Sequence, residues 1–333
     1  MNGLPAALRR HVPENAAAVT VTVRGGHADV TCHGAGVGPN SRFELGPVTG
    51  TFTALLLADA AARGEVDLGD PLDRYLPAEA RRRGSRGVTL LHLATHTSGL
   101  PRSPHGVLSS IPPRRYPNPD GTRDEERVSA LLSRTRSHAR PGTRVAYSDL
   151  GPGLLGHVLA HASGHPYRDL VVSRIGVPLG MTMTTCDPNG PQVTGYSLLG
   201  RARSRGYPPA LPAAGGLCST GSDLARYLAA HLDAAGVAPP SLARALGEVR
   251  RPRLVRPHGG DRVCLVWNLR GRSGTDLVFH CGGTRGFTSF VGFAPRSGVG
   301  FAALVNRPPG PANGFVRAAH GCLRDLAARP VSG

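Results

Sequence analysis

Strand-forming patterns stand at the two ends of this sequence, and helix-forming patterns stand between them. Residues 16–33, "AAAVTVTVRGGHADVTCH", alternate β-branched and polar residues around Gly25-Gly26, which is typical of a β-hairpin. After residue 260 the strand pattern returns as four runs, "RVCLVWNL", "DLVFHC", "FTSFVGFA" and "GVGFAALVN". One sheet built from both ends of the chain, with the middle forming a helical body beside it, pairs all of these strands.

The middle of the chain has apolar residues at helical spacing, and several of these segments stop at a glycine. The predicted helices cover 51–64, 149–164, 166–176 and 220–236, and a last helix covers 313–329. The 45 glycines and 30 prolines favour many short elements over one long bundle.

We therefore predict an α+β fold, with a mixed, mainly antiparallel sheet flanked by the terminal helices. A single domain covers residues 1–333. It divides into a sheet subdomain of about 1–50 and 260–333 and a helical subdomain of about 51–259. A chain of this length can bury a large core.

The termini and the cysteines bear on the compartment. No apolar run reaches the length of a membrane span, and "MNGLPAALRRHVPENAAAVTV" lacks the pattern of a secretory leader, so we expect a cytoplasmic protein with no membrane partner. The six cysteines are far apart and form no C-x-x-C pair, which favours reduced thiols over disulfides or a zinc site.

The net charge of +17 comes from arginine alone, because the chain contains no lysine. A genome that favours arginine codons explains this composition without any partner, and we prefer that interpretation. The alternative is an acidic protein partner, met by basic runs at 80–86, 201–205 and 248–256. Nucleic acid is disfavoured because no aromatic residues are interleaved with these runs.

Four stretches, in this order along the chain, resemble one known family. They are "FELGPVTGTFTALLLADAAARGEVDLGDPLDRYLP" (43–77), "VTLLHLATHTSGLP" (88–101), "PGTRVAYSDLGPGLLGHVLAHASG" (141–164) and "FHCGGTRGFTSFVGFAPRSGVG" (279–300). Together they resemble the serine β-lactamase and DD-peptidase superfamily, in its class C-like branch of β-lactamase-related hydrolases and esterases. The resemblance extends from about residue 16 to 306.

This resemblance implies acyl transfer by a serine and a lysine in S-x-x-K, a tyrosine in Y-x-N and a basic residue in K-T-G or H-x-G. "YSD" places Tyr147 at the tyrosine position and Asp149 where the pattern has asparagine. "HCG" places His280 in the strand motif. "PVTG" instead places Pro47 at the nucleophile position and Gly50 at the lysine position.

Pro47 and Gly50 lack the functional groups that acyl transfer needs, but both are compatible with a helix that begins here. Proline has no nucleophilic atom, yet it suits the first turn of a helix. Gly50 costs about 1 kcal/mol of helix propensity relative to alanine. With no lysine in the chain, and with arginine unable to act as a base, the inherited proton relay is absent.

Cys281 is the candidate for a relocated nucleophile, although neighbours on a strand point to opposite faces, so it should not meet His280. We prefer an inert thiol there, and Ser148 and Ser41 lack an evident base. His92 and His96, spaced i and i+4, could ligate a metal, but capping or core hydrogen bonding is favoured. No metal and no cofactor is predicted.

Asp149 also bears on the ligand, since a carboxylate accepts hydrogen bonds where an asparagine amide can donate them. A ligand with a donor or a cation is one explanation, and relaxed constraint on an unused pocket is the other. The predicted ligand-binding residues are Ser148, Asp149, Gly282 and Gly283, with Tyr147 and His280 at inherited catalytic positions.

Three hypotheses follow, in order of preference. The first is a small-molecule binding or converting protein that forms no seryl acyl-enzyme. The second is a hydrolase or acyltransferase that uses Cys281. The third is a non-catalytic protein whose arginine-rich surface binds an acidic partner.

Overall fold

The fold is seen in a computed structural model of the chain. It describes residues 3–78, 81, 85–102, 132, 135, 137–187, 192–203, 211–237, 239–256, 259–272, 275–310 and 312–329.

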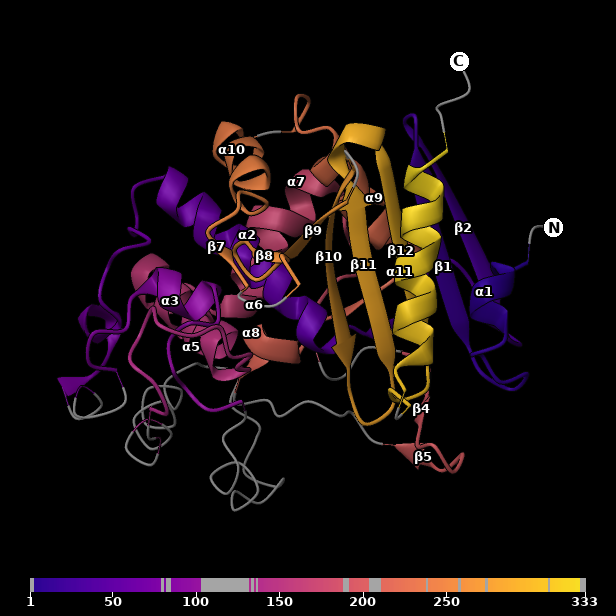
Figure 1. Cartoon of the computed structure of the whole chain (residues 1–333), viewed down its shortest axis with the longest axis horizontal. Coiled ribbons are helices and arrows are strands. Elements are labelled where there is room, and N and C mark those ends of the chain that lie inside the picture. The colour runs from indigo at the N-terminus through magenta and orange to yellow at the C-terminus, as the bar shows by residue number, and fades with distance from the viewer. Residues whose placement is uncertain are drawn as a thin grey trace.

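Both ends of the chain meet in one eight-stranded sheet, as the sequence predicts (Figure 1). Its strand order is β2-β1-β12-β11-β10-β9-β8-β7. The strands are β1 (Ala18–Arg24), β2 (His27–His33), β7 (Leu254–Val255), β8 (Arg262–Val263), β9 (Asn268–Arg272), β10 (Thr275–Gly283), β11 (Thr288–Ala294) and β12 (Val299–Val305). Every neighbouring pair is antiparallel, so the described sheet has none of the parallel pairing that a mixed sheet would include.

The hairpin prediction is confirmed at residue level. Gly25 and Gly26 turn the chain between β1 and β2 with φ values of 56° and 79°. Only glycine adopts such angles at low cost, and two positive φ values in succession match the twist of the flanking strands.

Helices make up much of the rest of the described chain. They are α1 (Ala6–Arg9), α2 (Thr49–Ala62), α3 (Leu90–Ala94), α5 (Leu150–Ser163), α6 (Tyr167–Val171), α7 (Val177–Leu179), α8 (Pro212–Gly215), α9 (Gly221–Leu232), α10 (Pro240–Glu248) and α11 (Gly314–Ala327). Shorter helical segments are η1 (Gly46–Val48), η2 (Leu72–Tyr75), η5 (Val172–Gly176) and η6 (Pro295–Ser297), and two-residue strand pairs join β3 (Phe43–Glu44) to β6 (Cys218–Ser219) and β4 (Gly195–Tyr196) to β5 (Ala202–Arg203).

The sheet has a helical layer on each face. Helix α11 packs on β10, β11 and β12 with α1 beside it, and α9 packs on β1, β11 and β12 from the helical body (Figure 1). One apolar cluster fills the space between the sheet and the helical body, and a second lies between the sheet and the terminal helices. The first cluster joins the two predicted subdomains, because it is continuous from β1 to α5.

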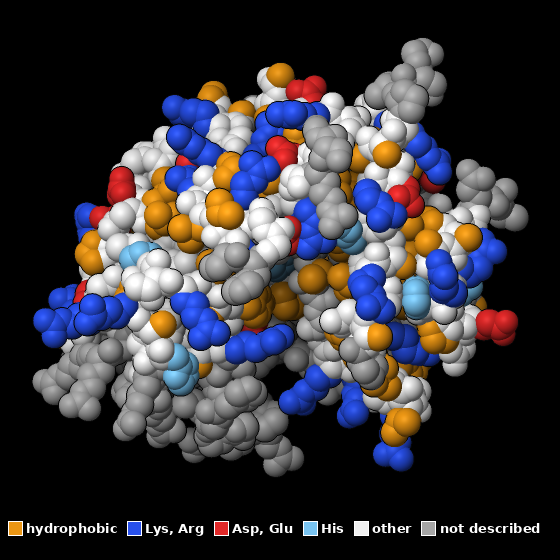
Figure 2. All heavy atoms as spheres, viewed as in Figure 1, with side chains coloured by type: hydrophobic (Ala, Val, Ile, Leu, Met, Phe, Trp, Pro, Cys, Tyr) orange, Lys and Arg blue, Asp and Glu red, His pale blue; other side chains and the backbone are white. Residues whose placement is uncertain are grey.

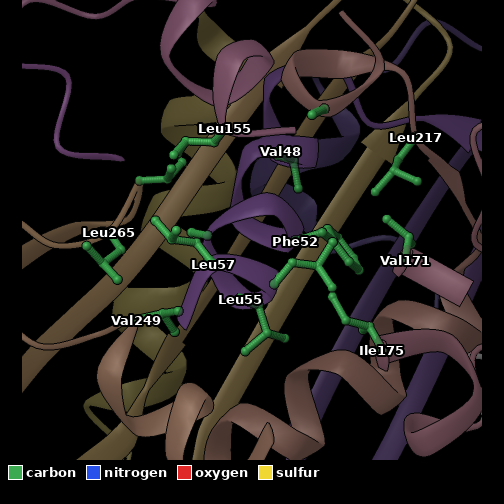
Figure 3. Packing of buried hydrophobic residues seen from close by; sticks show 14 of the residues in the cluster. Val48, Phe52, Leu55, Leu57, Leu155, Val171, Ile175, Leu217, Val249 and Leu265 are labelled. Carbon is green, nitrogen blue, oxygen red and sulfur yellow. The ribbon is translucent and has the colours of Figure 1, made fainter. Parts of the chain in front are cut away.

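Helix α2 lies at the centre of the helical body and is buried on all sides over residues 49–60. Phe52, Leu55 and Leu57 of this helix pack among apolar side chains from distant segments, including Val249 and Leu265 (Figure 3). Within the described residues, no helix is both long enough and apolar enough to cross a membrane.

One predicted strand is wrong. The run "RVCLVWNL", 262–269, is two strands, β8 and β9, separated by a tight turn in which the Cys264 amide donates to the Trp267 carbonyl oxygen at 2.9 Å. At the turn, Val266 has a φ of 64°. This angle is a genuine outlier for a β-branched residue. Its amide donates to the Ala94 carbonyl oxygen at 2.6 Å, which holds the turn against α3.

Candidate active site

The start of α2 forms one wall of the site. Pro47 lies in the single turn η1, which continues directly into α2 at Thr49. The helix start therefore survives a proline at this position, as predicted, because the first-turn amides of a helix have no intrahelical partner. Gly46 before it has a φ of 51°, and a side chain there would collide with Gly283 and Thr284.

Gly50 faces a space that other side chains already occupy. A Cβ atom added at Gly50 would lie 3.1 Å from Cγ1 of Val266 and 3.4 Å from Cγ of Pro152. Val266 is buried with 2% of its surface exposed. The strained turn between β8 and β9 therefore directs a valine side chain against the first turn of α2, and a side chain at position 50 would require Val266 to shift by a few tenths of an ångström.

Strand β10 forms the opposite wall. Its pairing with β9 ends at Phe279, so residues 280–283 have β11 on one side and η1 on the other. The close approach to η1 depends on Gly282, where an added Cβ would lie only 2.3 Å from the Leu45 carbonyl oxygen. Gly283 is packed in the same way against the ring of Pro309.

Tyr147 and Asp149 form a hydrogen-bonded pair just before α5. The Tyr147 hydroxyl donates to Oδ1 of Asp149 at 2.8 Å, and both side chains are half-buried. The Arg102 guanidinium lies 5.6 Å from the centre of the Tyr147 ring, within the range of a cation–π contact. Tyr147 therefore has a carboxylate at its hydroxyl and a guanidinium over its ring.

Ser148, between these two residues, is fully buried. Its hydroxyl donates to the Pro101 carbonyl oxygen at 2.6 Å, and its amide donates to Nδ1 of His96 at 3.4 Å. These contacts fix the loop that carries Tyr147.

Two buried histidines lie together at the base of the site. Burial lowers the pKa of His280 to about 4 and that of His96 to about 3, and the charges of His280 and Arg256 add to the effect at His96. The carbonyl oxygens of Val266 and Pro47 lie toward the His280 ring and partly offset its burial, although neither has the geometry of a regular hydrogen bond. Both imidazoles are therefore neutral near pH 7.

The family resemblance predicted His280 at this site, whereas nothing in the sequence indicated that His96 lies beside it. The ring of His96 lies 4.7 Å from that of Tyr147, and its φ of 55° is unusual for a residue other than glycine. His96 has the predicted hydrogen bond in the core, because its Nδ1 accepts the Ser148 amide. His92 has the predicted capping role, because it and Thr89 each accept a hydrogen bond from the other's backbone amide at the start of α3.

Cys281 lies on the other face of β10. It packs with Phe279 against the cluster that holds α11, whereas His280 faces Pro47 and Val266. Burial raises the pKa of the Cys281 thiol, so little of it is the reactive thiolate at neutral pH. The expected alternation along the strand thus separates Cys281 from His280.

The architecture of this chain is an eight-stranded antiparallel sheet with a helical layer on each face. The family model described as "Beta-lactamase" matches residues 9–321, so the chain belongs to the beta-lactamase family.

Two Escherichia coli K12 proteins illustrate the relationship. The chain is 30% identical over 285 residues to the D-alanyl-D-alanine-carboxypeptidase/endopeptidase AmpH, a match that covers 81% of this chain and 72% of AmpH. It is 29% identical over 308 residues to a beta-lactamase, covering 81% of this chain and 77% of that protein.

Solved structures show the same fold. A class C beta-lactamase from Rhodobacter sphaeroides superposes with a TM-score of 0.80 at 25% identity, covering 97% of this chain and 99% of that one. A beta-lactamase/D-alanine carboxypeptidase from Pseudomonas syringae gives a TM-score of 0.81 at 23% identity, covering 97% and 98%. The fold is therefore that of class C β-lactamases, and the predicted superfamily is confirmed.

Proposed function

We propose that this chain binds or converts a small molecule in the region between Pro47, Tyr147 and His280 without forming a seryl acyl-enzyme. The observation that carries the proposal is the space beside Gly50. A Cβ atom at position 50 would already lie 3.1 Å from Cγ1 of Val266, so a side chain there would require Val266 to shift. Pro47, one turn earlier, offers no nucleophilic atom.

The remaining side chains can bind and orient a ligand. The Asp149 carboxylate accepts hydrogen bonds, so it favours a ligand that presents an N–H, an O–H or a cation. His96, whose Nδ1 accepts the Ser148 amide, has Nε2 left as a donor, and the neutral ring of His280 has one nitrogen that donates and one that accepts. A β-lactam or peptide carbonyl oxygen would be repelled by Asp149, which argues for a substrate class different from that of the named relatives.

Intact-protein mass spectrometry tests the loss of acyl transfer. The natural protein and Cys281→Ala are incubated with benzylpenicillin, p-nitrophenyl acetate and an acetyl thioester. We expect no stable adduct on either protein, and hydrolysis of each donor at the rate of a protein-free control. An adduct on the natural protein that disappears in Cys281→Ala would instead support the second hypothesis, which places the nucleophile at Cys281.

Ligand binding is tested with Asp149→Asn and a matched control, Asp29→Asn, which removes the same charge from the exposed strand β2. In a thermal-shift screen of small amines and amino acids, we expect hits that raise the unfolding temperature of the natural protein and of Asp29→Asn but not of Asp149→Asn. Hits unaffected by Asp149→Asn would contradict this part of the proposal.

A cytoplasmic role in small-molecule metabolism is part of the same proposal, and cell fractionation tests it.

A further inference from the structure

A groove lies between the two terminal helices, on the face of the sheet away from His280. Its volume is about 320 Å³, in the range of small-ligand sites. The lining residues are Ala7, Arg10, His11, Gly314, Arg317, Ala318, Gly321, Arg324 and Asp325. The proposed function uses none of them, because α11 and the outer face of β10 separate the groove from the site.

The floor of the groove is made of small residues. Gly314, Ala318 and Gly321 follow at helical spacing along one stripe of α11, while Phe315, Ala319 and Leu323 of the same helix are buried against the sheet. A Cβ added at Gly321 would meet no atom within 4 Å. At Gly314 the His11 ring covers the stripe, since an added Cβ would lie 2.7 Å from its Cε1 atom, so a second chain can approach the α11 backbone closely only beyond it, at Gly321.

The walls of the groove are basic. Arg10 comes from the end of α1 and Arg317 from α11, and in the described part of the chain neither makes an ion pair with a carboxylate. Arg324 pairs with Asp325 at 2.8 Å, which neutralises the one acidic residue of the lining. Arginine side chains gather over α1 and α11 on this face of the molecule (Figure 2).

We propose that this groove binds an acidic peptide segment of a partner protein. The part of the stripe beyond His11, from Ala318 to Asp325, is about 10 Å long at 1.5 Å per residue, which matches about three residues of an extended peptide. Carboxylates along such a peptide complement Arg10 and Arg317, and the net charge of +17 attracts them over a longer range. The lining contains no Phe, Tyr or Trp on which nucleotide bases could stack, so a protein segment fits better than single-stranded nucleic acid.

Fluorescence anisotropy with fluorescein-labelled hexaglutamate at 50 mM salt tests the proposal. The groove variant is Arg10→Glu/Arg317→Glu. The control is Arg203→Glu/Arg244→Glu, which makes the same change of charge at exposed positions on β5 and α10. We expect the Kd to rise about tenfold in the groove variant and less than about twofold in the control, because two ion pairs become repulsive contacts only in the former.

A third variant separates shape from charge. Gly321→Leu places a side chain on the groove floor and changes no charge, and we expect it to weaken binding about fivefold with unchanged circular dichroism. Equal losses in both charge variants, or full affinity in Gly321→Leu, would show diffuse attraction and overturn the groove. Failure of the natural protein to bind hexaglutamate would overturn it too, as would tighter, groove-dependent binding of hexathymidylate. None of these outcomes bears on acyl transfer or on Asp149.

Discussion

The packing of Val266 against Gly50 predicts a large coupling free energy between the two positions. Alanine favours a helix interior over glycine by about 1 kcal/mol, so Gly50→Ala would stabilise α2 if its Cβ were free. In the native protein that Cβ lies 3.1 Å from Cγ1 of Val266, and overpacking of this kind costs about 1–3 kcal/mol. We therefore expect Gly50→Ala to destabilise the protein by about 1 kcal/mol.

Removing Cγ1 should reverse the sign. In the background of Val266→Gly or Val266→Ala, the nearest atom to the added Cβ is Cγ of Pro152, at 3.4 Å, which is ordinary van der Waals contact, and Gly50→Ala should now stabilise by about 1 kcal/mol. The coupling free energy is then about 2 kcal/mol, well above the few tenths expected of independent sites. Val266→Gly also relieves a positive φ, so its own cost is smaller than the loss of a buried valine would suggest.

Urea unfolding followed by circular dichroism measures all four members of this cycle. The control is Gly321→Ala, in the middle of α11 with open space around it, which should stabilise by about 1 kcal/mol in every background. Equal effects of Gly50→Ala in the natural protein and in the Val266→Gly background would refute the reasoning, because Val266 would then not limit the space at position 50.

Three further predictions concern buried polar groups. Asp59→Ala should lower the free energy of unfolding by about 1–2 kcal/mol in urea titrations, since it removes the buried partner of Arg63, while Arg174 keeps its ion pair with Glu65. Burial lowers the pKa of His231 to about 3, so this histidine stays neutral in the folded state. Its contribution to the free energy of unfolding is therefore fully present above pH 6.5, the ordinary pKa of histidine, and is lost as the pH falls toward 3. His231→Phe should therefore flatten the fall in stability by about 1.4 kcal/mol per pH unit between pH 6 and 4, in urea titrations at each pH. Iodoacetamide should modify Cys281 slowly in the native protein and fast in urea, as peptide mass mapping would report, because burial raises its pKa.

Much of the fold could be predicted from local patterns, because they depend on short-range geometry. The glycine pair at 25 and 26, the helix after Pro47 and the cap at His92 each involve neighbours in sequence. The strand predicted at 262–269 failed for the opposite reason. Its apolar run was consistent with a buried strand, but the amide of Val266 is bonded to Ala94, far away in the chain.

The same distinction holds for the candidate site. Motif positions identified Tyr147, Asp149 and His280, because the family resemblance supplied their spacing. Val266 belongs to no such motif, and His96 was assigned to the core, yet both line the site beside residues more than a hundred positions away. Long-range packing of this kind leaves no periodic signal in a single sequence.

Val266 occupies the space beside Gly50 at a local energetic cost. On the proposal that Gly50 replaces a long side chain, that replacement alone would leave a cavity, and cavities cost about 24 cal/mol per Å³. The structure instead fills the space with a valine held at a φ of 64°, a conformation that costs about 1–3 kcal/mol and persists only where surrounding contacts enforce it. The fit of Val266 beside Gly50 therefore depends on the contacts that hold the turn between β8 and β9, including the hydrogen bond from the Val266 amide to the Ala94 carbonyl oxygen.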